Sequence, residues 1–168
     1  MDQDLSGFRP SRLWKRLPTE RRIEAAGLFW DDEQSTDQQL EAIAAIASHM
    51  KFRTKSVLGL TPEKRARYLA TLPNISDTIA ARALVNYHLA RQRPMMAAFL
   101  DSVGVTHEEG LITDEQVSRP ESDKLKAAAE DLATKFPPAD VALYLSTLVS
   151  QDPETWGELA GTAQAVQP

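Results

Sequence analysis

The residues best suited to chemistry gather between positions 88 and 107, on either side of an Arg93-Pro94 step. They are two imidazoles, two guanidinium groups and one carboxylate: His88, Arg91, Arg93, Asp101 and His107. A histidine beside a carboxylate can act as a general acid or base, and arginine binds carboxylate or phosphate groups. One hypothesis is therefore a small-ligand-binding protein or an enzyme, with a polar pocket at this helix corner.

A structural interpretation of the two histidines competes with this hypothesis. His88 lies among apolar residues on a helical wheel, which is typical of a buried core histidine. Thr106 and Glu109 form a capping-box pattern that places His107 in the first turn of a short helical segment. We favour the structural interpretation for both histidines, and we assign no catalytic residue.

The chain lacks the sequence motifs of common catalytic and metal sites. It has no cysteine, which excludes disulfides, thiol catalysis and zinc–thiolate sites. It also has no glycine-rich phosphate loop, no H-E-x-x-H, no EF-hand loop and no nucleophile elbow. The Glu-x-x-His pairs of di-metal bundles do not occur either. We therefore predict no metal and no cofactor.

The charge of the chain is unevenly distributed. The net charge of −5 divides into +4 for residues 1–100 (15 Lys/Arg against 11 Asp/Glu) and −9 for residues 101–168 (4 against 13). One interpretation is that Arg82, Arg91 and Arg93 pair with acidic residues of the C-terminal half. A general nucleic-acid-binding protein is disfavoured, because such domains are usually strongly basic.

Residues 1–17 form a basic N-terminal arm, for which two interpretations stay open. Arg9, Arg12, Lys15 and Arg16 surround Trp14, a composition suited to partner binding with the indole as an anchor. Alternatively, the arm is a strap whose Trp14 packs on the core while the cations remain in water. These five residues are the candidate partner-binding residues.

The elements that position these residues are predicted to be helices. Proline at the first helical position, after a capping residue and before an acid, starts helices at Thr61-Pro62-Glu63 and Asp152-Pro153-Glu154. Capping boxes predict further starts at Thr36 with Gln39 and at Ser118 with Glu121. No segment has a convincing strand period. We predict an all-α fold: a compact bundle of eight or nine helices in antiparallel hairpins.

Two similar segments suggest an alternative arrangement. PEKRARYLATL (62–72) and PADVALYLSTL (138–148) match at six of eleven positions, and a capping residue follows each after a few residues. This similarity is compatible with a duplicated hairpin in a short α-helical superhelical stack. It is also compatible with chance, because amphipathic helices that begin with proline resemble one another.

Taken together, these patterns predict one all-helical domain over residues 1–160 and a frayed tail over 161–168. The leading functional hypothesis is a non-enzymatic protein-interaction or regulatory module that binds a protein partner or forms a homodimer. Its expected surfaces are the basic arm and the acidic loop 106–121. The N-terminal residues lack a signal-peptide pattern, and no stretch reaches the roughly 18 apolar residues of a membrane span. We therefore expect a cytoplasmic location without a membrane span.

Overall fold

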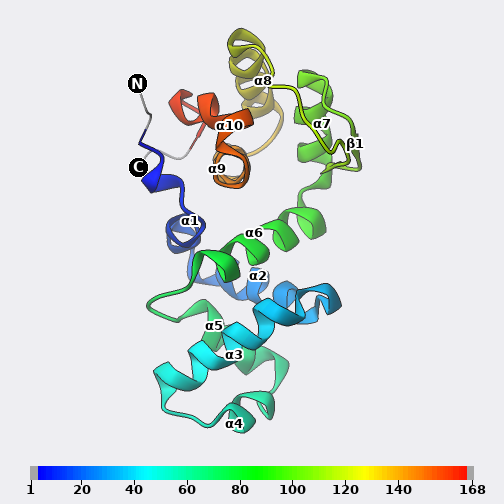
Figure 1. Ribbon diagram of the computed structural model, residues 1–168. Coiled ribbons are helices and arrows are strands. Elements are labelled where there is room, and N and C mark those ends of the chain that lie inside the picture. The colour runs from blue at the N-terminus through cyan, green and yellow to red at the C-terminus, as the bar shows by residue number, and fades with distance from the viewer. Residues whose placement is uncertain (1–3, 166–168) are drawn as a thin grey trace. The chain divides into compact units, whose positions relative to one another are not determined.

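The computed structural model describes residues 4–165, and its fold is all-α (Figure 1). This confirms the predicted fold class. The helices within the described residues are α1 (Pro10–Arg16), α2 (Thr19–Asp31), α3 (Thr36–Met50), α4 (Thr54–Leu58), α5 (Pro62–Ala70), α6 (Asp77–Arg91), α7 (Arg93–Val103), α8 (Ser122–Lys135), α9 (Pro138–Gln151) and α10 (Pro153–Trp156). Three short 3-10 helices are η1 (Ser6–Phe8), η2 (Glu33–Ser35) and η3 (Gly157–Gly161). A two-stranded antiparallel pair is formed by β1 (His107–Glu108) and β2 (Leu111–Ile112).

The described residues form two compact units, and the division between them falls within α6. The N-terminal unit comprises Pro10–Tyr87, and the C-terminal unit comprises residues 4–9 and 88–165. The two similar segments lie in different units, at the starts of α5 and α9. The duplication and the single-domain organisation stay predictions.

In the N-terminal unit, α2 packs against α5, and α3 contacts α4. The buried side chains of this unit include Phe29, Ile46, Leu69 and Ile79, each at most 1% exposed. On each of α2, α3, α5 and α6 the buried positions recur three or four residues apart, so one stripe of each helix faces inward. The short helix α4 is held by Val57, which is fully buried.

A polar network joins the end of α2 to α6 within the N-terminal unit. The Asp32 carboxylate accepts hydrogen bonds from the Ser35 hydroxyl at 2.5 Å and from Asn86 Nδ2 at 3.1 Å. Arg82 Nε donates to Ser35 Oγ at 2.8 Å, and Arg82 Nη2 lies 3.7 Å from Asp32 Oδ2. The prediction that Arg82 pairs with the acidic C-terminal half is therefore wrong, because its acidic partner precedes it in the chain.

This network should make the stability of the fold sensitive to acid. The Ser35 hydrogen bond, more than the Arg82 charge, holds the pKa of Asp32 below its usual value. A carboxyl with a lowered pKa in the folded state stabilises the fold above its unfolded pKa of about 3.9, and this stabilisation is lost as the pH falls through the folded pKa. We expect Asp32→Asn to lower the free energy of unfolding by about 1 to 2 kcal/mol at pH 7.

Urea unfolding of both proteins between pH 7 and pH 2 measures this effect. The difference between wild type and Asp32→Asn should shrink below about pH 4, where the wild-type carboxyl becomes protonated. Asp31→Asn is the matched control, since Asp31 is the exposed neighbour of Asp32. If the difference in free energy of unfolding between wild type and Asp32→Asn stays constant over this pH range, the assigned charge on Asp32 is contradicted.

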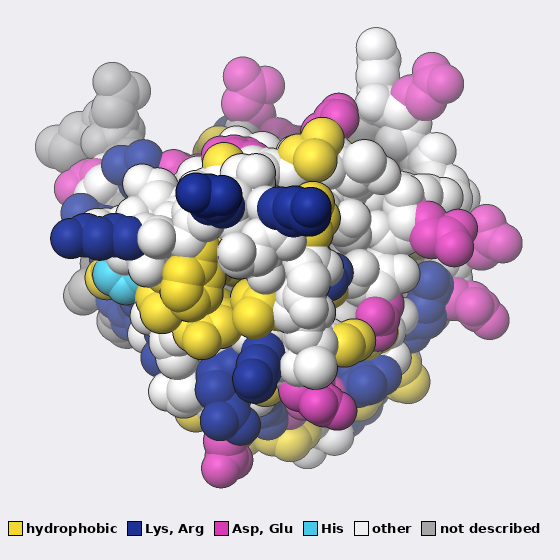
Figure 2. Space-filling view, turned by 90° about the horizontal axis from the view of Figure 1, so that it is seen from below, with side chains coloured by type: hydrophobic (Ala, Val, Ile, Leu, Met, Phe, Trp, Pro, Cys, Tyr) yellow, Lys and Arg dark blue, Asp and Glu magenta, His cyan; other side chains and the backbone are white. Residues whose placement is uncertain are grey.

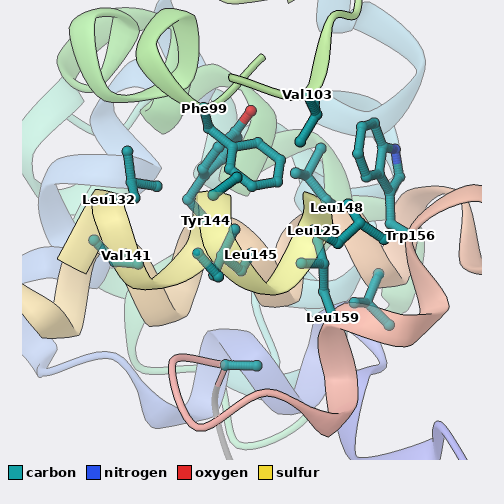
Figure 3. Close-up of a cluster of buried hydrophobic side chains, with 14 of the residues drawn as sticks. Phe99, Val103, Leu125, Leu132, Val141, Tyr144, Leu145, Leu148, Trp156 and Leu159 are labelled. Atoms are coloured by element: carbon teal, nitrogen blue, oxygen red, sulfur yellow. The ribbon is translucent and has the colours of Figure 1, made fainter. Parts of the chain in front are cut away.

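In the C-terminal unit, the core gathers around α9 (Figure 3). Side chains from α7, α8, α10 and η3 pack on the buried face of α9, and Phe8 of η1 joins them. Phe99, Trp156 and Leu145 are at most 2% exposed. Thr162 and Ala165 are also buried, whereas residues 166–168 lie outside the described part of the chain. The frayed tail stays a prediction.

The proline-started helices begin where the sequence predicts them. Thr61 Oγ1 accepts from the Lys64 amide at 3.3 Å, and Asp152 Oδ1 accepts from the Thr155 amide at 3.3 Å. Two predicted capping boxes are wrong. Gln39 Nε2 donates instead to main-chain carbonyls at the end of α2, and α8 begins at Ser122 rather than after a Ser118 cap.

Candidate functional site

The Arg93-Pro94 corner is held by the arginine itself. Arg93 Nε donates to the carbonyl of Leu89 at 2.8 Å, and Arg93 Nη1 donates to the carbonyl of Glu109 at 2.9 Å. The guanidinium therefore connects the last turn of α6 to the turn between β1 and β2. The prediction that Arg93 pairs with C-terminal carboxylates is wrong, since its partners are main-chain oxygens.

A β-hairpin occupies the place of the predicted short helix. Glu108 pairs with Leu111, and Glu109 and Gly110 form the turn with φ angles of 48° and 90°. Two consecutive positive φ angles are typical of a type I′ hairpin turn. The predicted capping box at Thr106 is therefore wrong, because Gly110 favours this turn over a continuing helix.

His107 fixes the hairpin to α7. Its Nδ1 accepts a hydrogen bond from the Gly110 amide at 3.1 Å, so the ring proton resides on Nε2. Nε2 lies 2.7 Å from Asp101 Oδ1 and donates to it. The His107 side chain is 12% exposed and that of Asp101 is 73% exposed. Both ring nitrogens are thus engaged in contacts that position the hairpin.

His88 lies in a different environment within the C-terminal unit. It is 2% exposed, and its ring centroid lies 5.6 Å from that of Tyr144. Burial raises the pKa of the Tyr144 hydroxyl above its ordinary value of about 10, so this phenol stays protonated to higher pH than an exposed tyrosine. Arg91 is exposed at the end of α6. The structure therefore brings Asp101 and His107 together and joins Arg93 to the same hairpin, whereas His88 is a core residue.

The candidate residues of the basic arm divide into buried and exposed groups. Trp14 is fully buried together with its neighbour Leu13, which removes the indole from the surface. Arg12, Lys15 and Arg16 are not buried on α1 in the N-terminal unit, and Arg9 is exposed in the C-terminal unit. Partner binding through these cations stays a prediction, but Trp14 is not available as an anchor.

A pocket lies inside the acidic loop of the C-terminal unit. Its volume is about 420 Å³, and it opens to solvent. The loop residues that line it include Asp114, Gln116, Ser118 and Glu121, and the C-terminal end of α7 provides the apolar side through Val103. The sequence indicated the acidic loop but not the pocket. The pocket forms only where the loop lies against the end of α7, and the sequence does not show this contact.

A second surface feature, missed by the sequence interpretation, surrounds α4 in the N-terminal unit. Exposed cations and exposed apolar side chains occur together in residues 51–67. Figure 2 shows apolar side chains between groups of lysine and arginine on one face of the molecule. The composition gave a signal that could have been used: six Lys/Arg against one acid within residues 51–67.

The chain matches no protein-family model, no curated protein and no solved structure. Between residues 4 and 165, no three His, Asp or Glu side chains are grouped so that they could hold a metal ion. Over the same residues, no helix is long and apolar enough to cross a membrane. The functional proposal therefore depends on the surfaces described above.

Proposed function

We propose that this chain is a non-enzymatic helical module that binds a protein partner through its acidic loop. The observation that carries the proposal is the pocket of about 420 Å³ in that loop. Small-molecule sites are usually lined by apolar and aromatic side chains. This pocket is open, and six of its eleven lining residues are charged or polar, which suits the side chains of a bound peptide segment better.

The charge of the loop indicates the chemistry of the partner. Residues 106–121 contain five acids and one arginine, a net charge of −4 with His107 neutral. That single cation, Arg119, forms an ion pair with Glu158 of η3, which anchors the loop on the unit. Asp114 and Glu121 are exposed at the pocket, which Arg119 and the exposed Lys124 of α8 also line, so the negative charge belongs to the loop as a whole rather than to the pocket lining. A segment rich in lysine or arginine complements this surface and is steered toward it.

The corner hypothesis, in which a small ligand or a substrate binds beside Arg93, has weaker support. Arg93 donates to two carbonyls, and both nitrogens of His107 are engaged. A ligand at this corner would have to displace contacts that hold the hairpin. The interaction module therefore remains our proposal, and a cytoplasmic location and any homodimer belong to it as predictions.

Selection of random peptides displayed on phage against the full chain tests this proposal. We expect enriched sequences to contain lysine or arginine, with binding that weakens as salt is raised. Asp114→Lys with Glu121→Lys should weaken binding of the selected peptides at least about tenfold, because each substitution places a lysine of the loop against the cations of the peptide. Glu130→Lys with Glu154→Lys is the matched control at exposed positions of α8 and α10.

Two results would overturn the proposal. Peptides without cations, or equal binding to both charge-reversed proteins, would show that the acidic loop is not the binding site. Circular dichroism of both variants establishes that the helices are retained.

A further inference from the structure

The segment around α4 is an exposed part of the N-terminal unit. Of residues 51–64, all are exposed except Val57, which is buried, and Leu60, which is half-buried. Val57 is fully buried and anchors the segment, while its neighbours are exposed to solvent. A continuous exposed segment of this kind offers area for contact with a partner surface.

The cations of this segment face water. Arg65 is the exception, since its Nη2 donates to the carbonyls of Leu58 and Leu60 and its guanidinium lies 5.4 Å from the Trp30 ring. The remaining cations are exposed: Lys51, Arg53, Lys55, Lys64 and Arg67. With Glu63 as the one acid, residues 51–67 carry a net charge of +5. We call this surface the α4 face.

Two apolar side chains are exposed within the α4 face. Leu58 is 56% exposed at the end of α4. Phe52 is 37% exposed, and its ring lies nearly perpendicular to that of Tyr68 at a centroid distance of 6.0 Å. An exposed phenylalanine and an exposed leucine among several cations are the residue types that enter the head-group and acyl boundary of a bilayer.

We propose that the α4 face docks on an anionic lipid membrane. The cations would contact the lipid head groups, and Phe52 and Leu58 would reach the acyl boundary. Each cation near an anionic leaflet strengthens binding by about fivefold, and the attraction acts over about one Debye length. A local surface charge of +5 can therefore dock even though the whole chain carries −5. Phosphates of a nucleic acid would match the cations but would leave the aliphatic Leu58 without an apolar partner.

Co-sedimentation of the full chain with vesicles tests this inference. We expect binding to vesicles of about 70% phosphatidylcholine and about 30% phosphatidylserine that is at least about 100-fold tighter than binding to pure phosphatidylcholine. Lys55→Glu with Lys64→Glu should weaken binding at least about tenfold. Lys126→Glu with Lys135→Glu, at exposed positions of α8, changes the net charge equally and should leave binding within about twofold of wild type.

A fluorescence measurement tests insertion independently. Phe52→Trp should show a blue-shifted emission with anionic vesicles and quenching by lipids brominated in the acyl chain. Leu111→Trp, at an exposed position of the other unit, should show neither effect.

Several results would overturn the inference. The first is that the folded wild type does not bind anionic vesicles at low salt. The second is that the two double variants, one in the α4 face and one in α8, lose binding equally. The third is that the indole at position 52 stays in water when vesicles are added. Tighter binding to a single-stranded or duplex oligonucleotide than to vesicles would assign the α4 face to nucleic acid instead. None of these outcomes bears on the acidic loop, which lies in the other unit.

Discussion

Replacement of Phe99 by alanine is expected to lower the free energy of unfolding of the C-terminal unit by about 3 to 5 kcal/mol. Phe99 is fully buried, and its ring centroid lies 5.9 Å from those of both Tyr144 and Trp156 (Figure 3). Loss of the ring removes the aromatic contact between α7 and the α9–α10 region and leaves a cavity. Close-packed neighbours relax only partly into such a cavity, so the lost contacts are not recovered.

Urea unfolding followed by tryptophan fluorescence measures this loss, because Trp156 reports on the affected contacts. Leu111→Ala is the control: Leu111 is 47% exposed, and its truncation should change the free energy by no more than about 0.5 kcal/mol. A loss below about 1 kcal/mol in Phe99→Ala would contradict the described core.

Replacement of Gly110 by alanine should have the second-largest effect, a destabilisation of about 2 to 4 kcal/mol. Gly110 has a φ of 90°, which disfavours any residue with a Cβ atom. In addition, a Cβ atom here would lie 2.7 Å from the Cβ atom of Met96 and 3.3 Å from the carbonyl oxygen of Arg93. Both atoms belong to the first turn of α7, so the hairpin must move away from the helix.

Gly27→Ala provides a matched control. Gly27 lies inside α2, and no neighbouring side chain or other element comes within 4 Å of the position that a Cβ atom would take. Alanine should therefore stabilise the helix by about 0.5 to 1 kcal/mol. Hydrogen exchange gives a local readout for Gly110→Ala, since the Thr113 amide is bonded to the Thr106 carbonyl at 3.2 Å. Unchanged protection of that amide would show that the hairpin had not moved.

The sequence predicted the fold class and several helix starts because these depend on local geometry. Proline fixes φ at a helical value and needs no amide hydrogen bond in the first turn. A capping side chain one residue earlier then satisfies a nearby amide, as Thr61 and Asp152 do. Every group involved lies within four residues of the others, so this sequence pattern predicts a helix start without any knowledge of tertiary contacts.

The capping boxes failed because their members found stronger partners elsewhere. Gln39 donates to the carbonyls of Phe29 and Asp32 at 2.9 and 2.8 Å, where it satisfies the end of the preceding helix. At Thr106, the positive φ of Glu109 and Gly110 closes a hairpin against α7. A glutamate or glutamine three residues after a threonine cannot reveal these distant acceptors.

The candidate site was only partly predictable for the same reason. Charge counts identified the acidic loop, and the helical wheel placed His88 among apolar neighbours, in agreement with its burial. The wheel could not show that Arg93 would donate to the carbonyls of Leu89 and Glu109, because the second acceptor belongs to an unpredicted turn. The pocket likewise depends on the path of residues 113–121 past the end of α7.

The most direct test of the proposed function is amide chemical-shift mapping of the full chain with a selected lysine- or arginine-rich peptide. The proposal predicts that the largest shifts cluster at the pocket, at Gln116, Ser118 and the neighbouring loop amides. It also predicts that Asp114→Lys with Glu121→Lys weakens peptide binding and so reduces these shifts at a given peptide concentration. Shifts centred on Arg93 and His107, with an unperturbed loop, would contradict the proposal and support a ligand site at the helix corner.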